Sequence, residues 1–250
     1  EKYIQFFKNV AEKTREMIVH WQRVGFVHGV MNTDNMSIHG ITIDYGPYGW
    51  LEDYNPNWTP NTTDAEGKRY RFGNQANIAL WNLYQLANAL YPLIEEAEPL
   101  ETILNNFAKK YDEDFSEMML KKLGITSKNE ENDKLIQQLL YNLEQTETDF
   151  TIFFRNLNQI NTADSVEECV SKINFAFYKP EEVTGIILET WHFWFAQYLS
   201  ILKEETASDD ERKLQLNSVN PKYVLRNYMA QTAIELAEKE DYSLIDELYT

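Results

Sequence analysis

Cysteine is almost absent from this chain of 250 residues, since Cys169 is the only one. An intrachain disulfide and a zinc site built from several cysteines are therefore excluded. Sparse cysteine fits a reducing compartment, and we expect a cytoplasmic protein. Long apolar runs are also missing: no stretch approaches the ~18 residues that a membrane span needs, and no signal-peptide pattern is present. We therefore expect no membrane partner.

Basic residues are few, with 23 Lys and Arg against 40 Asp and Glu and a formal net charge of −17. Nucleic-acid-binding proteins usually carry a basic patch, so we expect no nucleic-acid partner and interpret the acidity as a solvated surface. The phosphate-binding patterns of the P-loop and of G-x-G-x-x-G are absent. The one basic cluster, Lys68-Arg69-Tyr70-Arg71, could contact phosphates, an acidic substrate segment or only water.

Apolar periodicity predicts a mainly α-helical fold with one small β-hairpin. The chain begins with Glu1, and its first residues already have the pattern of a helix interior, so we interpret it as a piece of a longer protein. The expected helices are 2–23 (ended by Gly25), a segment from 77 interrupted at Pro92, 99–110, 112–123, 131–145, 147–158, 181–203, and a last pair within 221–247 with Pro221 in its first turn.

The segments between these helices also have recognisable patterns. Residues 26–27 are expected to be extended, and the apolar runs 36–38 and 41–43 around His39-Gly40 predict a tight hairpin. Residues 46–74 are rich in Gly, Pro, Asn, Asp and aromatics, which predicts a long ordered loop of functional importance. Residues 206–212 are expected to form a polar surface turn. The aromatic run 191–195 is more typical of a core than of a ring-binding site.

The most informative stretch runs from His28 to Asn35 and is followed by Asp44-Tyr45-Gly46. This is the spacing of the protein-kinase catalytic loop, H-R-D-x-x-x-x-N, and of the D-F-G that follows it. The alignment places Asn35 and Asp44 on the two metal-binding residues of a kinase. It places Val30 on the catalytic Asp, and valine cannot accept a proton. The pattern therefore indicates a kinase-like fold with a different chemistry, or with none.

Asn35 and Asp44 are the candidate metal and nucleotide ligands, because Mg²⁺ prefers oxygen ligands that it shares with nucleotide phosphates. Alone, each is more typical of a turn or a strand end; their joint spacing favours the metal site. Asp34 is the nearest carboxylate that could replace the missing base, although a loop Asp that bonds its own backbone is an equal alternative. His28 is expected to position the loop backbone.

Five segments together resemble the selenoprotein O family of kinase-like proteins. They are His28–Ile38, Thr42–Pro47, Leu51–Pro56, Arg71–Gln75 with Ile78–Leu83, and Asn220–Gln231. The resemblance implies transfer of AMP from ATP, bound in an inverted orientation, to Ser, Thr or Tyr hydroxyls of proteins. It implies that Asp34 is the catalytic carboxylate and that Asn35 and Asp44 hold Mg²⁺ (or Mn²⁺). A bacterial protein is expected.

The resemblance also implies that residues 1–250 are a kinase-like C-lobe. Its parts would be a catalytic loop at 26–36, a metal loop at 43–47, the ordered loop at 46–74 and a helical remainder at 77–250. The Lys–Glu pair and the phosphate-clamping Arg of the family belong to an N-terminal half that this chain lacks. We therefore expect the N-terminal lobe of the same protein as a partner, and little ATP binding or catalysis by this chain alone.

Three further expectations complete this interpretation. Cys169 lies outside the matched segments, so redox control by cysteine is not inferred. An ATP-binding pseudokinase with a regulatory or scaffold role is an alternative, which Val30 permits. A small-molecule phosphotransferase of the aminoglycoside-kinase type also has Gly after the loop His, but its chemistry depends on the Asp that Val30 replaces.

Overall fold

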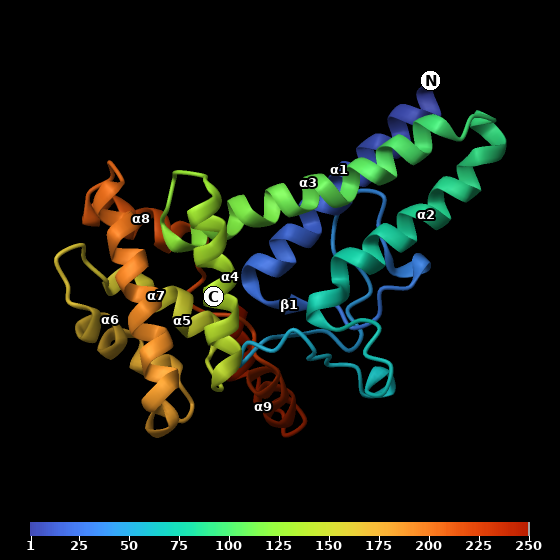
Figure 1. Cartoon of the computed structure of the whole chain (residues 1–250). Helices are drawn as coiled ribbons and strands as arrows, with labels where there is room; N and C mark the ends of the chain where they lie inside the picture. Colours follow the sequence, from blue (N-terminus) through green and yellow to red (C-terminus); the bar gives the residue numbers. More distant parts are fainter. Residues whose placement is uncertain (250) are drawn as a thin grey trace.

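The computed structural model describes residues 1–249, which are mostly helical and include one two-stranded antiparallel sheet (Figure 1). The helices are α1 (Lys2–Val24), α2 (Gln75–Ile94), α3 (Glu98–Leu123), α4 (Glu130–Gln145), α5 (Phe150–Asn156), α6 (Val166–Ile173), α7 (Gly185–Glu204), α8 (Asp209–Val219), α9 (Asn227–Ala237) and α10 (Ser243–Tyr249). In the described part of the chain, no helix is long and apolar enough to cross a membrane.

Helix α1 confirms the first predicted helix and its end. Its apolar residues recur at helical spacing and bury one face, which includes Phe7, Ile18 and Trp21. Gly25 ends the helix in the left-handed conformation with φ 72°, and its N–H bonds the carbonyls of Trp21 and Gln22. Glycine adopts this conformation without the penalty that a Cβ would impose. The chain therefore turns sharply into strand β1 (Phe26–Val27).

Strand β1 pairs with β2 (Gly49–Trp50), not with a neighbouring hairpin. The hairpin predicted at 36–43 is wrong: a turn forms, with the Gly40 N–H bonded to the Ser37 carbonyl, but neither flank is a strand. Gly40 lies directly against the Lys13 backbone of α1, because a Cβ built on it would come within 2.8 Å of the Lys13 carbonyl oxygen. The segment therefore packs on α1 instead of pairing with itself.

Helix α3 is one continuous helix where the sequence predicts two, 99–110 and 112–123. No Gly or Pro interrupts it near residue 111, and Tyr111 packs against both hydrophobic clusters of the molecule. The N-terminal part of α3 buries Leu104 and Phe107 against α1 and α2. Its C-terminal part buries Met119 and Leu123 in the second cluster. One long helix therefore connects the two cores.

The first cluster, here the N-terminal core, joins α1, α2 and the first half of α3, which extend together to the upper right of Figure 1. The second, here the aromatic core, lies among α3 to α8. Trp191, Trp194 and Phe195 of α7 are fully buried in it, which confirms the predicted core role of the run 191–195. Phe193, which is 57 % exposed, points away from this core.

The remaining elements depart from the sequence prediction in several places. The predicted surface turn 206–212 is wrong, because α8 begins at Asp209 and Arg212 is buried, paired with Asp209 at 2.8 Å. Helix α9 begins at Asn227, and Pro221 lies in the connection before it. Helix α6 was not predicted, and it carries Cys169, which is buried without a disulfide partner. Burial, above all, raises the pKa of this thiol to about 12.

Other predictions are confirmed within a few residues. Helix α4 matches the expected 131–145, and Pro92 lies in the last turns of α2. The expected helix 147–158 is α5 followed by a 3₁₀ turn, Leu157–Gln159. Residues 46–74 are an irregular ordered loop that contains only β2 and two 3₁₀ turns, Thr62–Asp64 and Phe72–Asn74.

Candidate functional site

The start of the predicted catalytic loop, residues 26–36, is fixed by amide side chains of helix α2. Gln75, fully buried in its first turn, accepts a bond from the His28 N–H at 3.1 Å and donates one to the Phe26 carbonyl at 2.9 Å. About two turns further along the same face, Asn82 donates to the Met31 carbonyl at 3.0 Å. Buried backbone groups outside helices and sheets need such partners. Helix α2 therefore sets the path of the loop.

Two further amides bind the carbonyls between these points. Asn61, in the long loop, donates to the Gly29 carbonyl at 3.0 Å, and Asn35 donates to the Val30 carbonyl at 3.0 Å. Gly29 has φ 80°, and a Cβ there would lie 2.4 Å from the Pro47 carbonyl oxygen. A residue larger than glycine therefore cannot occupy position 29 without moving the segment that follows Asp44.

His28 connects the predicted catalytic loop to the predicted metal loop, residues 43–47. Its ring is buried, its Nε2 lies 2.8 Å from the Ile43 carbonyl, and its Nδ1 accepts the Val30 N–H at 3.3 Å. This pattern assigns the proton to Nε2, which donates to Ile43. The predicted positioning role of His28 is confirmed. Because Asp44 follows Ile43 directly, its position depends on the same imidazole as the loop that carries Asp34.

Asp34 and Asn35 lie in a 3₁₀ turn, Thr33–Asn35, at the end of the catalytic loop. The Asp34 side chain is exposed, and within residues 1–249 its carboxylate has neither a hydrogen bond nor an ion pair. It does not bond its own backbone, so the alternative role as a turn-forming Asp is not what the structure contains. Asn35 is half-buried; its Nδ2 bonds Val30, and its Oδ1 has no partner in the same residues.

Asp44 lies at the surface in a sharp bend. It has φ 55°, a left-handed conformation that Asp tolerates better than most residues, and its carbonyl accepts the Gly46 N–H at 2.8 Å. Its carboxylate, like that of Asp34, is without a protein partner within residues 1–249. Directly after the bend, the rings of Tyr45 and Tyr48 pack against Phe26 of β1. The exposed Asp44 carboxylate is therefore carried by a backbone segment that packed aromatic rings hold in place.

The donor atoms of these side chains are of the kind that a magnesium–nucleotide site uses. Mg²⁺ is usually bound through one or two carboxylates, substrate phosphates and water, not by a complete protein cage. The Asp44 carboxylate and the Asn35 Oδ1 are oxygens not engaged by protein groups of residues 1–249. In the same residues, no three His, Cys, Asp or Glu side chains gather into a metal-binding group. A metal here would therefore depend on the nucleotide for further ligands.

Sequence analysis did not identify the amides that hold the loop. Asn82 lies on the buried face of α2 between Ile78 and Leu83, and a polar side chain on an apolar stripe is the signal that could have revealed it. Gln75 and Asn61 have no comparable local signal. Their partners lie 47 and 32 residues away, so only the folded chain identifies them.

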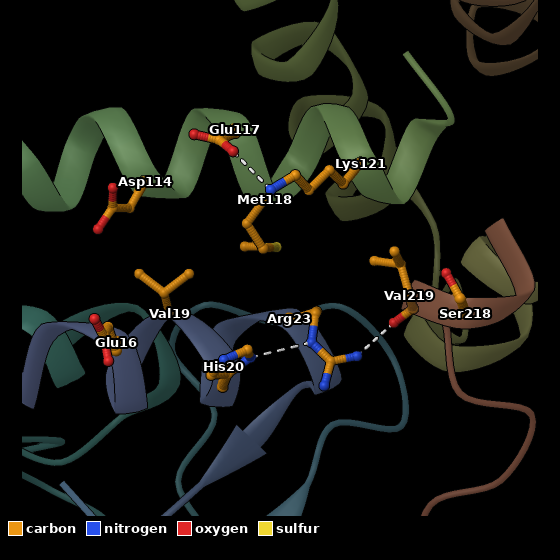
Figure 2. Close-up of a pocket in the computed structure, with 10 residues that line it drawn as sticks. All are labelled: Glu16, Val19, His20, Arg23, Asp114, Glu117, Met118, Lys121, Ser218 and Val219. Carbon is orange, nitrogen blue, oxygen red and sulfur yellow. Dashed lines mark hydrogen bonds and ion pairs between the residues drawn. The ribbon is translucent and has the colours of Figure 1, made fainter. Parts of the chain in front are cut away.

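A hollow of about 450 Å³ lies away from the candidate site, between α1, α3 and the end of α8 (Figure 2). Most of its charged side chains are engaged with protein groups: Glu117 pairs with Lys121 at 2.6 Å, and Arg23 bonds the Val219 carbonyl. None of Asp34, Asn35 and Asp44 lines it. We interpret it as a groove between packed helices and not as part of the candidate site.

Known proteins match this chain along its whole length. The family model described as "Protein adenylyltransferase SelO" matches residues 1–250. The protein nucleotidyltransferase YdiU of Flavobacterium johnsoniae is 64% identical over 250 residues, which are 100% of this chain and 48% of that protein. Proteins of the same name from Aromatoleum aromaticum and Rhodopirellula baltica are 49% and 48% identical, over 98% and 97% of this chain and 46% and 47% of theirs. The chain thus spans about half the length of these relatives, and it belongs to the protein adenylyltransferase SelO family.

Proposed function

We propose that the full-length protein transfers AMP from ATP to Ser, Thr or Tyr hydroxyls of other proteins, and that this chain is its kinase-like C-lobe. One observation carries the proposal. Asp34, Asn35 and Asp44 present free oxygens from two segments that the single side chain of His28 connects, while Val30 occupies the position of the kinase base. Family membership and the names of the relatives support the reaction type.

In this proposal Asp34 is the general base. It accepts the proton of the acceptor hydroxyl as that oxygen attacks the α-phosphorus of ATP, and pyrophosphate leaves with the electrons of the broken P–O bond. Asn35 and Asp44 would hold Mg²⁺, which supplies charge neutralisation at the phosphates. Mn²⁺ has similar ligand preferences and would fit the same oxygens. The exposure of Asp34 suits this role, because a base must reach the substrate proton.

The rest of the protein is the expected partner of this chain. About half of each matched relative lies outside the aligned region. We propose that this other half forms an N-terminal lobe that supplies the cationic groups around the phosphates, since the candidate site presents carboxylates and an amide. The chain alone would then bind ATP weakly and transfer little AMP. The named relatives are bacterial, and we propose a bacterial cytoplasmic setting.

The test uses the full-length protein with Mg²⁺ and ATP labelled at either the α- or the γ-phosphate. We expect protein to retain label from the α-position only. Asp34→Ala should lower transfer by about 10²–10⁴-fold, as loss of a general base does, while ATP binding is retained. Asp44→Ala should weaken Mg-ATP binding. Asp112→Ala, which removes an exposed carboxylate of α3 far along the chain from the loop, is the matched control.

The same experiment distinguishes the alternatives. Label from the γ-position alone would indicate a kinase with an unexpected base and would contradict the proposal. Absence of label with ATP still bound would indicate a pseudokinase scaffold, which the valine at position 30 favours over an ordinary kinase. Unchanged Mg-ATP affinity in Asp44→Ala would show that the metal assignment is wrong.

A further inference from the structure

The basic segment, residues 68–71, is bonded directly to the catalytic loop. The Tyr70 hydroxyl donates a hydrogen bond to Asn32 Oδ1. Asn32 immediately precedes the 3₁₀ turn that carries Asp34 and Asn35. Although 38 residues separate the bonded pair in sequence, the basic segment therefore lies beside the proposed base.

The backbone of the basic segment is fixed by Asp64. The two carboxylate oxygens of Asp64 accept the N–H groups of Arg69 and Tyr70 at 2.9 and 2.7 Å. Asn74 adds a bond to the Arg69 carbonyl at 2.7 Å. This carboxylate is thus engaged with the backbone and makes no ion pair with the neighbouring cationic side chains. The segment is ordered, and in residues 1–249 no carboxylate pairs with its cationic side chains.

The side chains of Lys68, Arg69 and Arg71 have no carboxylate partner within residues 1–249. The Arg69 guanidinium lies 4.8 Å from the ring centre of Trp81 and 5.7 Å from that of Tyr70, so two aromatic rings orient it. A guanidinium that stacks on aromatic faces keeps its N–H edge available for a carboxylate. In a chain of net charge −17, three cations without a carboxylate partner, on a segment bonded to the loop of the proposed base, are a local exception.

We propose that the basic segment is a docking surface for acidic side chains near the acceptor hydroxyl of the substrate protein. The inference rests on the proposed function, because it assigns the surface to the acceptor and not to another ligand. Charge complementarity selects this partner: planar guanidinium groups bind carboxylates through two parallel hydrogen bonds. ATP phosphates are the less favoured partner. Arg69 packs on the Trp81 ring of α2, and the next residue, Tyr70, bonds Asn32 beside Asp34; neither contact leads to Asp44, the candidate metal ligand.

The test measures binding and transfer separately, with the full-length protein. Two peptides with one central Thr are compared, one flanked by Glu and one by Gln. By fluorescence anisotropy the wild type should bind the Glu peptide more tightly, and added salt should reduce the difference. Lys68→Glu with Arg69→Glu should reduce this preference about tenfold or more, since attraction becomes repulsion at two exposed positions. Lys203→Glu with Lys213→Glu, the same double charge reversal at exposed positions of α7 and α8, should leave the preference unchanged.

Transfer of α-labelled AMP should follow the same order, with the KM for ATP unchanged in the double variant. Arg69→Lys, which keeps the charge and loses the planar fork, should give an intermediate preference. Equal binding of both peptides by the wild type would overturn the inference, whether or not AMP is transferred. A raised KM for ATP with unchanged peptide preference would also overturn it and assign the segment to phosphates. Preference for the Glu peptide without any AMP transfer would support the docking surface and contradict the proposed function.

Discussion

The catalytic-loop region, residues 26–74, and the aromatic core are built on different interactions. In the loop region almost no backbone lies in helix or sheet, and side chains of Gln75, Asn61 and Asn82 bind the loop's backbone groups. In the aromatic core, backbone groups bond within helices, and packed rings such as Trp194 and Tyr198 fill the space between them. Irregular backbone can present reactive side chains at a surface, provided that other polar groups satisfy it.

This difference predicts different consequences of mutation. A truncation in the aromatic core removes apolar contacts that the whole helical part shares, so it should lower the stability of the protein. Loss of one amide in the loop region leaves a few backbone groups unpaired near Asp34, so its main effect should be local. Variants of the aromatic core should therefore change mainly the unfolding free energy, and variants of the loop region mainly the local order near Asp34.

The largest stability effect is expected for Trp194→Ala. The Trp194 side chain is fully buried, stacks on Tyr198 at 5.0 Å and donates its indole N–H to the Leu135 carbonyl at 3.0 Å. Its truncation leaves a large cavity, and should lower the unfolding free energy by about 3–5 kcal/mol. Urea denaturation of the full-length protein measures the change.

Phe193→Ala is the matched control, because Phe193 is the preceding residue of α7 and is 57 % exposed. Its truncation should change the unfolding free energy by no more than about 0.5 kcal/mol. A similar loss in both variants would show that α7 is not anchored by its buried aromatic face, and would contradict the assignment of the aromatic core.

Gln75→Ala should have a smaller effect on stability and a strong local one. The buried N–H of His28 and the carbonyl of Phe26 lose their partner, which costs about 1–3 kcal/mol. Because the loop path depends on this amide, the backbone amides of residues 28–32 should exchange hydrogen faster, while those of α7 remain unchanged. Hydrogen-exchange mass spectrometry measures both segments in one sample.

Gln85→Ala is the control for this prediction, since Gln85 lies on the same helix, is half-buried and has no hydrogen bond to residues 1–249. It should leave exchange in the loop unchanged. Uniformly faster exchange in Gln75→Ala, in α7 as well as in the loop, would mean that the two regions share one cooperative unit and that the contrast between them is wrong.

The sequence predicted the fold best where local patterns decide it. The apolar period and Gly25 predicted α1 and its end. Helix α8 was missed although Ser208 and Glu211 form a capping box, a local signal that was present in the sequence. The hairpin failed for another reason: Gly40 is pressed against Lys13, a contact that two-residue alternation cannot reveal.

For the site, loop spacing alone predicted the positioning role of His28, which its bonds to Val30 and Ile43 confirm. The roles of Asp34, Asn35 and Asp44 remain predictions, although the structure gives them the free oxygens that those roles require. The amides that fix the loop were beyond sequence reasoning. A hydrogen bond across tens of residues has no periodicity, so it becomes visible only when the chain is folded.

The smallest predicted change in stability concerns a loop in the helical part of the molecule. Like the catalytic loop, this loop is fixed by a side chain that bonds its backbone groups. The Glu205 carboxylate, just after α7, accepts bonds from Thr126 and Ser127, including both of their backbone N–H groups, at 3.2 and 3.1 Å. Partial burial raises the pKa of this carboxyl, but the hydrogen bonds outweigh it and hold the pKa below its ordinary value of 4.5. The charged form is therefore favoured by folding.

This stabilisation is complete above pH 4.5 and is lost as the pH falls through the lower folded-state pKa. Glu205→Gln should accordingly be less stable than the wild type at neutral pH, by less than about 1 kcal/mol for so solvated a contact, and the difference should vanish in acid. Glu204→Gln, at an exposed neighbouring carboxylate, should show no such convergence. A wild-type advantage that persists unchanged however far the pH falls below 4.5 would mean that shape, not charge, fixes this loop. The loop bound by Glu205 would then resemble the amide-bound catalytic loop more closely than we propose, because neutral donors and acceptors would suffice to fix both loops.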